Sequence, residues 1–315
     1  MPALSDKNQI ELSVVVATYN RGGYILDTLL SLAAQTLPGP KWELLVVNNN
    51  STDDTEAIVE QFARENPGIN VRHVVELQQG VSYARTRGVT DSRGGYIVYV
   101  DDDELVNDRF LEVFYDFFEA RPEVGAAGGR TIARYTESVP RWMSPFTERP
   151  IACIVDHGSL PRPFPPGRFF GGGNMALRRT TFDKYGLFDT GLGRVRRGLM
   201  AGEEKEFYMG MKEGGEQIWY LPDAVVEHVT PPDKLTGSYF RRLTRQIGSS
   251  EKVRTQSIGR GAYLARIASE VVKWGGVAVL SIFYTLTLRP AKAKYIIIMR
   301  WQVTLGLLGK NIVRS

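Results

Sequence analysis

Short apolar runs alternate with amphipathic stretches over the first hundred residues of the chain. The run at 12–17 is β-branched and bounded by polar residues, which is typical of a buried parallel strand. Comparable runs follow at 43–47, 71–75 and 96–100, and apolar residues at helical spacing predict helices over 24–37, 53–65 and 81–90. Strands that alternate with helices in this way indicate βαβ units, and therefore an α/β fold with a mostly parallel sheet flanked by helices.

Polar residues follow three of the predicted strands directly, at 18–21, 48–54 and 101–104. The carboxyl ends of parallel strands meet at the same edge of a sheet, and ligands of such sheets bind beyond that edge. These three segments are therefore the expected place for a functional site.

The third of these segments consists of four adjacent acids, Asp101, Asp102, Asp103 and Glu104. Such carboxylates repel one another unless a cation or hydrogen bonds compensate. Alternate residues of an extended segment point the same way, so Asp101 and Asp103 can face one site. A hard divalent ion that bridges to a diphosphate is the natural partner, and a solvated acidic loop or helix N-cap is the alternative.

The composition is that of a globular protein, with 43% hydrophobic and 23% charged residues among 315, and a single cysteine, Cys153. Charge, however, is unevenly distributed along the chain. Residues 241–315 carry 14 basic and two acidic residues, a net of +12, whereas 1–240 carry 25 basic and 33 acidic residues, a net of −8. An acidic body with a basic tail predicts two different physical roles.

Seven of the 16 prolines fall in residues 139–166. This density predicts a long irregular segment, either a loop that faces the substrate or a linker.

The basic tail alternates charge with apolar sequence. A run of 15 uncharged residues at 274–288 would span about 22 Å as a helix, short of the roughly 30 Å hydrocarbon core of a bilayer. Apolar residues at helical spacing, with Trp274 and Trp301 among them, are typical of helices that lie in an anionic membrane interface. A helical bundle or dimer interface in solution is the alternative. We therefore expect a catalytic domain over 10–240 and a basic, amphipathic helical extension over 241–315.

Seven segments, in one order over roughly residues 12–250, resemble the family 2 glycosyltransferases. They read VVVATYNR at 14–21, VVNNNSTDDT at 46–55, GVSYAR at 80–85, DDD at 101–103, FFGGGNMALRR at 169–179, GEE at 202–204 and PDAVVEH at 222–228. The resemblance implies a GT-A fold, a nucleotide-sugar donor and inverting sugar transfer assisted by Mn²⁺ or Mg²⁺.

The resemblance also implies a set of residues that bind the nucleotide sugar, namely Thr18, Asn20, Arg21, Asn48, Asp53, Arg85, Asp101, Asp102, Gly173 and Asn174. Asn48 replaces an aspartate that commonly reads the base, and an amide can still donate and accept hydrogen bonds there. Asp53 either contacts the ligand or caps the following helix. Asp102 is expected to make a ribose or structural contact, and the glycines before Asn174 permit a close backbone approach to a ligand.

Metal ligands and the catalytic base follow from the same resemblance. Asp101, Asp103 and His228 are the expected ligands of the divalent ion, which would stabilise the leaving diphosphate. Glu204 stands where the family has its catalytic aspartate and is the expected base, with Glu203 as the second candidate. An exposed acidic helix face is the alternative explanation of these glutamates.

The expected partners are a UDP-sugar donor, a lipid-linked or glycan acceptor and a membrane surface at the cytoplasmic face, with no nucleic acid. A non-catalytic nucleotide-sugar-binding or scaffold protein on the same fold is one alternative. A sugar nucleotidyltransferase is another, although the N-terminal Gly-x-Gly loop that such enzymes usually need is missing around Gly22 and Gly23.

Overall fold

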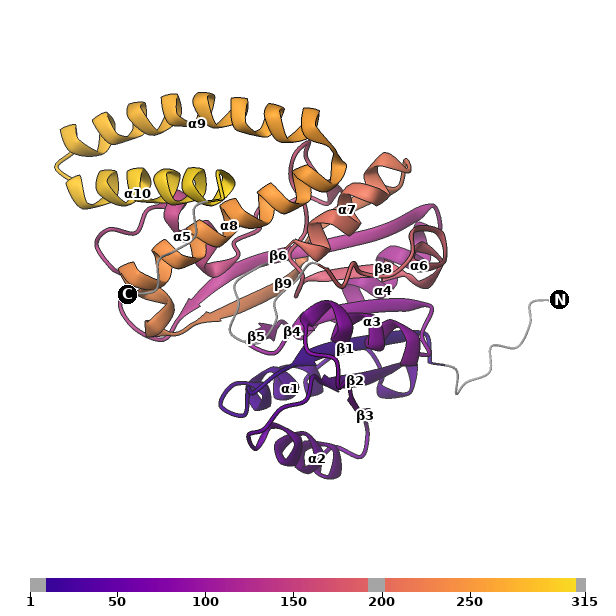
Figure 1. Cartoon of the computed structure of the whole chain (residues 1–315). Helices are drawn as coiled ribbons and strands as arrows, with labels where there is room; N and C mark the ends of the chain where they lie inside the picture. Colours follow the sequence, from indigo (N-terminus) through magenta and orange to yellow (C-terminus); the bar gives the residue numbers. More distant parts are fainter. Residues whose placement is uncertain (1–9, 192–201, 310–315) are drawn as a thin grey trace. The chain divides into compact units, whose positions relative to one another are not determined.

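The computed structural model describes residues 10–191 and 202–309 of the chain. Those residues form two compact units (Figure 1). The first contains residues 10–132, 155–191 and 203–228, and the second contains 133–154, residue 202 and 229–309. Residues 192–201 and 310–315, which belong to the two predicted domains, lie outside the described part.

A parallel sheet forms the first half of unit 1. Its strands are β1 (Leu12–Thr18), β2 (Trp42–Asn48), β3 (Asn70–Val75) and β4 (Tyr96–Asp101), in the order β3-β2-β1-β4. The connections carry α1 (Ile25–Ala33), the short 3₁₀ helix η1 (Gly39–Lys41), α2 (Thr55–Glu65) and α3 (Val81–Asp91). The four predicted strands are confirmed. The first helix, predicted over 24–37, ends at Ala33, and the N–H of Thr36 donates to the backbone oxygen of Asp108 at 2.9 Å instead of to a helical carbonyl.

The sheet continues with antiparallel strands. They are β5 (Glu104–Val106), β6 (Val124–Tyr135), β7 (Arg162–Pro163), β8 (Met175–Arg178) and β9 (Gln217–Thr230), and the order past β4 is β8-β6-β9-β5, with β7 paired to β9. Helices α4 (Phe110–Ala120), α6 (Arg179–Tyr185) and α7 (Glu203–Glu213) complete the unit. The predicted α/β class with a mostly parallel sheet at its centre is therefore confirmed.

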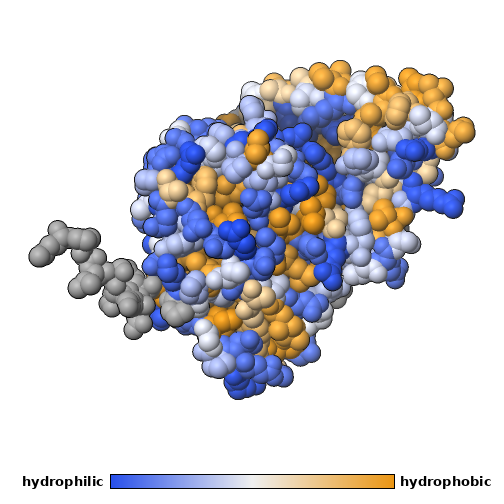
Figure 2. Space-filling model, turned by 180° about the vertical axis from the view of Figure 1, so that it is seen from behind, coloured by the Kyte–Doolittle hydropathy of each residue, from blue (hydrophilic) through white to orange (hydrophobic). Residues whose placement is uncertain are grey.

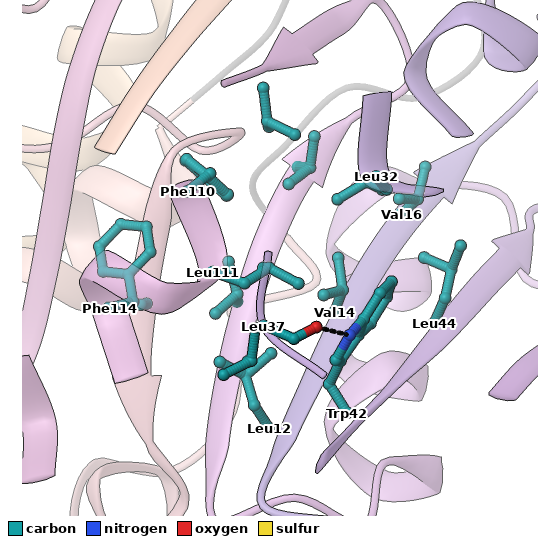
Figure 3. Packing of buried hydrophobic residues seen from close by; sticks show 14 of the residues in the cluster. Leu12, Val14, Val16, Leu32, Leu37, Trp42, Leu44, Phe110, Leu111 and Phe114 are labelled. Atoms are coloured by element: carbon teal, nitrogen blue, oxygen red, sulfur yellow. Dashed lines mark hydrogen bonds between the residues drawn. The ribbon is translucent and has the colours of Figure 1, made fainter. Parts of the chain in front are cut away.

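Hydrophobic cores cover both faces of the sheet. Val14 and Val16 of β1 pack with α1, α2 and α4 in one core, whereas Val15 packs with α3, α6 and α7 in the other. This division follows from the two-residue period of a strand, which sends neighbouring side chains to opposite faces. In the first core the buried indole of Trp42 donates a hydrogen bond to the backbone oxygen of Leu37 at 3.1 Å (Figure 3).

Unit 2 is helical and larger than the expected 241–315 extension. It contains α5 (Pro145–Ala152), the short η2 (Pro232–Leu235), α8 (Gly237–Ile258), α9 (Arg260–Leu286) and α10 (Pro290–Leu307), with α10 packed against both α8 and α9 (Figure 1). Residues 133–154 join it because Trp142 stacks on Tyr295, with ring centroids 4.2 Å apart, and also packs on Phe240. Aromatic stacking thus joins two segments that are far apart in the sequence.

The proline-rich segment contains a helix that its composition did not predict. Ser144 and Thr147 form a reciprocal capping box at the start of α5, and Pro145 occupies the first turn, where a missing N–H costs nothing. The expectation of a wholly irregular 139–166 segment was therefore wrong over these eight residues.

Candidate active site

The carboxyl ends of the parallel strands bring the polar segments together. In the register of the sheet, Thr18 stands opposite Asn48, and Ala17 stands opposite Asp101. All of the predicted site residues belong to unit 1. The polar segments that the sequence predicted therefore meet at one edge of the sheet.

The acid segment after β4 is held against the loop after β1. Arg21 Nε lies 3.4 Å from Asp102 Oδ1, and its terminal nitrogen lies 3.5 Å from Asp103 Oδ2. Burial raises the pKa of Asp102 to about 7, against the opposing charge of Arg21 and with the help of the charge on Asp103. The segment is therefore short of positive charge.

His228 reaches this segment through the pairing of β5 with β9. That pairing sets Glu104 opposite His228 and leaves His228 Nε2 3.7 Å from Asp103 Oδ1, with both side chains nearly buried. Glu104 is buried as well, and burial with the charges of Asp101 and Asp103 raises its pKa well above the ordinary value. A buried carboxyl group whose pKa is raised by neighbouring carboxylates marks a region of high negative potential.

Arg85 of α3 connects the acid segment to the start of α7. One terminal nitrogen lies 3.0 Å from Asp101 Oδ1, and the other lies 2.5 Å from Glu203 Oε1. The Arg85 side chain is only 4% exposed, and Tyr99 donates a hydrogen bond to its backbone oxygen at 3.2 Å. Burial alone would lower the pKa of Arg85, but the neighbouring carboxylates, Asp101 and Glu203 foremost, raise it.

The first turn of α7 carries Glu203, Glu204 and Glu206. Acids in this turn are favoured by the helix dipole. Glu203 is buried in its ion pair with Arg85, whereas Glu204 is partly exposed. Burial and the charge of Glu203 raise the pKa of Glu204 to about 8, against the opposing charge of Arg85. Glu204 is thus the more accessible carboxylate of the two, and its raised pKa makes it a stronger base than an ordinary glutamate.

The loops after β1 and β2 are tied together by side-chain hydrogen bonds. Asn20, at a positive φ of 52°, accepts from the backbone N–H of Thr52 at 2.7 Å. Asn48 accepts from the backbone N–H of Ser51 at 2.9 Å. Asp53 accepts from Gly22 and from Thr55, and these hydrogen bonds lower its pKa although burial opposes them.

The contacts of Asp53 are those of a carboxylate that holds the start of α2 and the loop after β1. They include the N–H of Thr55, the first residue of α2, whereas the N-cap position itself is Asp54, which makes no side-chain cap hydrogen bond.

Two glycines of the 171–173 run allow close packing on the charged cluster. A Cβ on Gly172 would lie 2.3 Å from a terminal nitrogen of Arg85, and one on Gly173 would lie 2.1 Å from Glu104 Oε2 and 2.7 Å from the carboxyl carbon of Asp101. Asn174 is buried, accepts from Gly129 at 3.1 Å and donates to the Arg130 backbone oxygen at 3.0 Å. These residues form the wall against which Arg85 and the acids pack.

The chemistry of the donor set fits a divalent cation. Asp101 is 40% exposed, Asp103 and His228 lie in contact, and the carboxylates around them exceed the positive charge that Arg21 and Arg85 supply. Carboxylate oxygens with an imidazole are suitable ligands for Mn²⁺ or Mg²⁺.

Among the described residues, the group of three whose ligand atoms all lie within 4.8 Å of one another is a different one, Glu56, Glu60 and His73 on α2 and β3. Its glutamates are exposed, and exposed acids commonly gather without an ion. The side chains of Asp101, Asp103 and His228 would therefore have to close around an ion together with substrate oxygens.

Sequence reasoning missed several residues of this arrangement. Glu104 was recognised only as one of four acids, and Gly172 only as part of a glycine run. Asn49, which is buried, donates to two backbone oxygens of the loop after β3 and accepts from Gly80 at 2.7 Å. Its place in a run of three asparagines directly after a strand was the available signal.

Comparison with known proteins identifies the family. The model of "Glycosyl transferase family 2" matches residues 13–186. A glucosyl-dolichyl phosphate glucuronosyltransferase of Haloferax volcanii is 25% identical over 222 residues, which are 70% of this chain and 69% of that protein. The succinoglycan biosynthesis protein ExoM of Rhizobium meliloti is 28% identical over 245 residues, which are 76% of this chain and 74% of ExoM.

Solved structures share the fold. The mannosyltransferase PcManGT from Pyrobaculum calidifontis, in complex with GDP-Man and Mn²⁺, aligns with a TM-score of 0.63 at 19% identity and covers 96% of this chain and 88% of its own. Residues 1–349 of S. aureus TarS in complex with UDP align with a TM-score of 0.54 at 19% identity, over 96% of this chain and 94% of that one. The predicted GT-A fold is thus confirmed, and the chain is a glycosyltransferase that belongs to glycosyl transferase family 2.

Proposed function

We propose that this glycosyltransferase is an inverting, metal-dependent enzyme that moves a sugar from a nucleoside diphosphate sugar to a hydroxyl group of a lipid-linked or polysaccharide acceptor. The observation that carries the proposal is a charged cluster in which Arg21 pairs with Asp103 of the acid segment and Arg85 joins Asp101 of the same segment to Glu203, next to Glu204 with its raised pKa. It links the predicted metal ligands to the predicted base.

The donor side of the site follows from the loops after β1 and β2. Thr18, Asn20 and Asn48 line the strand ends at which the nucleotide would lie, and Arg21 lies between these loops and the acid segment. Asp101, Asp103 and His228 would hold the divalent ion, which neutralises the diphosphate and so assists its departure. A UDP-sugar is the donor to test first. The solved structures of similar fold that contain UDP and GDP-Man support a nucleoside diphosphate sugar as the donor.

The transfer itself needs a proton acceptor for the acceptor hydroxyl. Glu204 takes that proton while the hydroxyl oxygen forms a bond to the anomeric carbon, and the bond from that carbon to the phosphate oxygen breaks with its electron pair on the nucleoside diphosphate. Attack from the face opposite the leaving group inverts the anomeric centre. A carboxylate with a pKa of about 8 is a stronger base than an ordinary glutamate, and Arg85 keeps Glu203 from competing for the role.

The acceptor class and the location rest on different support. The relatives named for a glucosyl-dolichyl phosphate substrate and for succinoglycan biosynthesis support a lipid-linked or polysaccharide acceptor. Residues 241–315 carry a net charge of +12, and among the described helices α9 is long and apolar enough to cross a membrane by length and composition. We place the enzyme at the cytoplasmic face of the membrane, bound peripherally or at the interface.

Thermal shift with nucleotides and metal tests the donor half of this proposal. UDP and GDP are titrated with Mn²⁺ or with EDTA against the wild-type chain, Asp103→Asn and Glu204→Gln. A nucleotide at about 100 times its Kd stabilises the folded state by about 2.7 kcal/mol. We expect that stabilisation to need Mn²⁺ in the wild-type chain, to be lost in Asp103→Asn and to persist in Glu204→Gln.

A radiolabelled donor and membranes that contain the acceptor lipids test the transfer half. Glu204→Gln should bind the nucleotide with Mn²⁺ and fail to transfer the sugar. Nucleotide stabilisation that is equal with EDTA, or full transfer by Asp103→Asn, would contradict the metal-dependent mechanism.

A further inference from the structure

An apolar stripe runs along the whole of α9. It consists of residues whose side chains are between 55% and 78% exposed, Leu264, Val271, Val272, Val279, Ile282, Phe283 and Leu286. Their spacing follows the helical repeat, so they lie on one face, about 33 Å long at 1.5 Å per residue. Figure 2 shows hydrophobic residues gathered at the upper right of the view, over α9 and α10. A contiguous apolar surface of this length marks an interaction site.

The opposite face of α9 is polar at its centre and is fixed to α10. Glu270, whose side chain is 5% exposed, lies 2.9 Å from a terminal nitrogen of Arg300 on α10 and also pairs with Arg266 one turn away on α9. Thr304 donates a further hydrogen bond to Glu270 at 3.3 Å. Towards the end of α9, Val277 and Tyr284 are buried in a small core with Ala293 and Ile296 of α10. The two helices therefore move as one body.

This arrangement argues against a simple transmembrane role for α9. The helix has 27 residues, about 40 Å, and Glu270 and Lys273 lie near its middle. Even if its last 20 or so residues crossed a bilayer, Glu270 and Lys273 would lie roughly 5 Å and 9 Å inside the hydrocarbon, together with the Arg300 of α10 that pairs with Glu270. Ionised side chains at that depth are strongly unfavourable. The apolar stripe and the ionic face instead point in opposite directions, as in a helix that lies at an interface.

Charge decides between a lipid surface and a second copy of the chain. The only acids in 241–315 are Glu251 and Glu270, and each is paired with arginines of the same unit. Exposed basic residues flank α9, with Arg260 at its first residue and Arg289 and Lys294 just after its end and in the first turns of α10. Two such surfaces repel each other, whereas an anionic bilayer attracts both the charge and the stripe.

We infer that α9 lies parallel to the membrane, with the stripe from Leu264 to Leu286 immersed in the boundary between headgroups and acyl chains of an anionic leaflet. The enzyme is then monotopic, and α10 with its ion pairs stays on the water side of α9. This inference rests on the membrane location in the proposed function, and it adds which helix meets the lipid and how that helix is oriented.

Depth measurements with fluorescent probes test the orientation. Single cysteines replace Leu264, Val271 or Ile282, which share one line along α9, in a full-length chain that carries Cys153→Ser. Each probe is read in vesicles of phosphatidylcholine and phosphatidylglycerol, with nitroxide quenchers at two depths of the acyl chain and with aqueous iodide. An in-plane helix gives the same shallow depth at all three positions. A gradient of depth from 264 to 282, or quenching by iodide at all three probes as strong with vesicles as without them, would overturn the inference.

Flotation of the same vesicles tests the stripe without probes. Val271→Asp and Ile282→Asp should each weaken vesicle binding roughly tenfold or more, because each places a charge in the apolar boundary. Leu30→Asp on α1, an exposed leucine of unit 1, is the matched control and should bind like the wild-type chain. Wild-type binding by both α9 variants would contradict the inference.

Stabilisation by nucleotide shows whether a negative result concerns the membrane orientation of α9 or the proposed sugar transfer. The α9 variants should keep the stabilisation by UDP or GDP with Mn²⁺, and Asp103→Asn should keep vesicle binding. A chain that transfers sugar but shows a depth gradient would leave the proposed chemistry intact and remove only the in-plane arrangement.

Discussion

Two clusters of buried charge in the described part of the chain differ in their balance. In unit 1, Arg21 and Arg85 are surrounded by six acidic residues, which are Asp101, Asp102, Asp103, Glu104, Glu203 and Glu204. In unit 2, the carboxylates Glu251 and Glu270 are met by Arg254, Arg266, Lys273 and Arg300. Acids are in excess in the first cluster, and bases are in excess in the second.

The difference separates a binding site from a structural contact. Burial of unbalanced carboxylates is unfavourable, and the raised pKa values of Asp102, Glu104 and Glu204 are its consequence. A cluster of that kind is stabilised by the arrival of a cation or of a proton, and so it can serve catalysis. The paired cluster of unit 2 is already satisfied, so it holds helices together.

The largest effect is expected from the base of the unbalanced cluster. Glu204→Gln should lower kcat about 10²–10⁴-fold, because the amide cannot take the acceptor proton. The free energy of unfolding should not fall, since the substitution removes a carboxyl group whose ionisation is already unfavourable within a crowded set of acids. Steady-state transfer and denaturant unfolding measure the two quantities. Glu206→Gln, in the same turn of α7, is the control and should keep most of the activity. An equal loss in both variants would contradict the assignment of the base.

The second effect compares one substitution in the two clusters. Glu270→Gln should lower the free energy of unfolding by about 3–5 kcal/mol, because Arg266 and Arg300 lose the carboxylate that pairs with both. Glu203→Gln should cost less, because Arg85 keeps its contact with Asp101 at 3.0 Å. Urea unfolding of the full chain measures both losses. If Glu203→Gln destabilised the protein as much as Glu270→Gln, the charge balance would not distinguish the clusters.

The smallest effect is a pH dependence of stability. The pKa of Asp102 rises from an ordinary 3.8 to about 7 in the folded chain, so the folded state binds the proton more tightly than the unfolded chain does. The free energy of unfolding therefore falls as the pH rises from about 4 to about 7. We expect Tm to decrease by roughly 2–4 °C between about pH 5 and pH 7 for each kcal/mol lost, and Asp102→Asn to flatten that slope.

The pKa of Glu270 is shifted in the opposite direction from that of Asp102, so the two clusters should respond differently to pH. Burial alone would raise its pKa, but Arg266 and Arg300 hold the pKa of Glu270 below its ordinary value. Its contribution to stability is therefore present at neutral pH and is lost only in acid. A Tm that rose between pH 5 and pH 7 in the wild-type chain, without Mn²⁺, would contradict the excess of buried acid in unit 1.

Much of the fold was predictable because it follows from local periodicity. The two-residue alternation around Val14 and Val15 and the apolar runs that follow specify buried parallel strands, whatever lies elsewhere in the chain. The helix α5 and the recruitment of 133–154 into unit 2 were not predictable from composition. They depend on a capping box and on the stacking of Trp142 with Tyr295, a partner that lies far along the sequence.

The candidate site also combines features that the local sequence shows with features that arise only when distant segments pack together. The acids after β4 could be recognised as a cluster because a strand end and four adjacent carboxyl groups are visible in the sequence. The pairing of Arg85 with Glu203, which lies 118 residues further along the chain, could not be recognised in the sequence, because it depends on where α3 and α7 meet the sheet. The glycine at 173 was predicted to face a ligand, yet its lack of a side chain also makes room for Glu104 and Asp101.

The sequence by itself determined the alternation of strands and helices over the first hundred residues, the polar strand ends, the acidic body and the basic tail, because each depends on neighbouring residues. The tertiary structure decided which charges are balanced. Arg85 is shared between Asp101 and Glu203, and Glu270 is enclosed by Arg266 and Arg300, only after distant segments pack. The energy of a buried charge depends on its partners and on the exclusion of water, and both exist only in the folded chain.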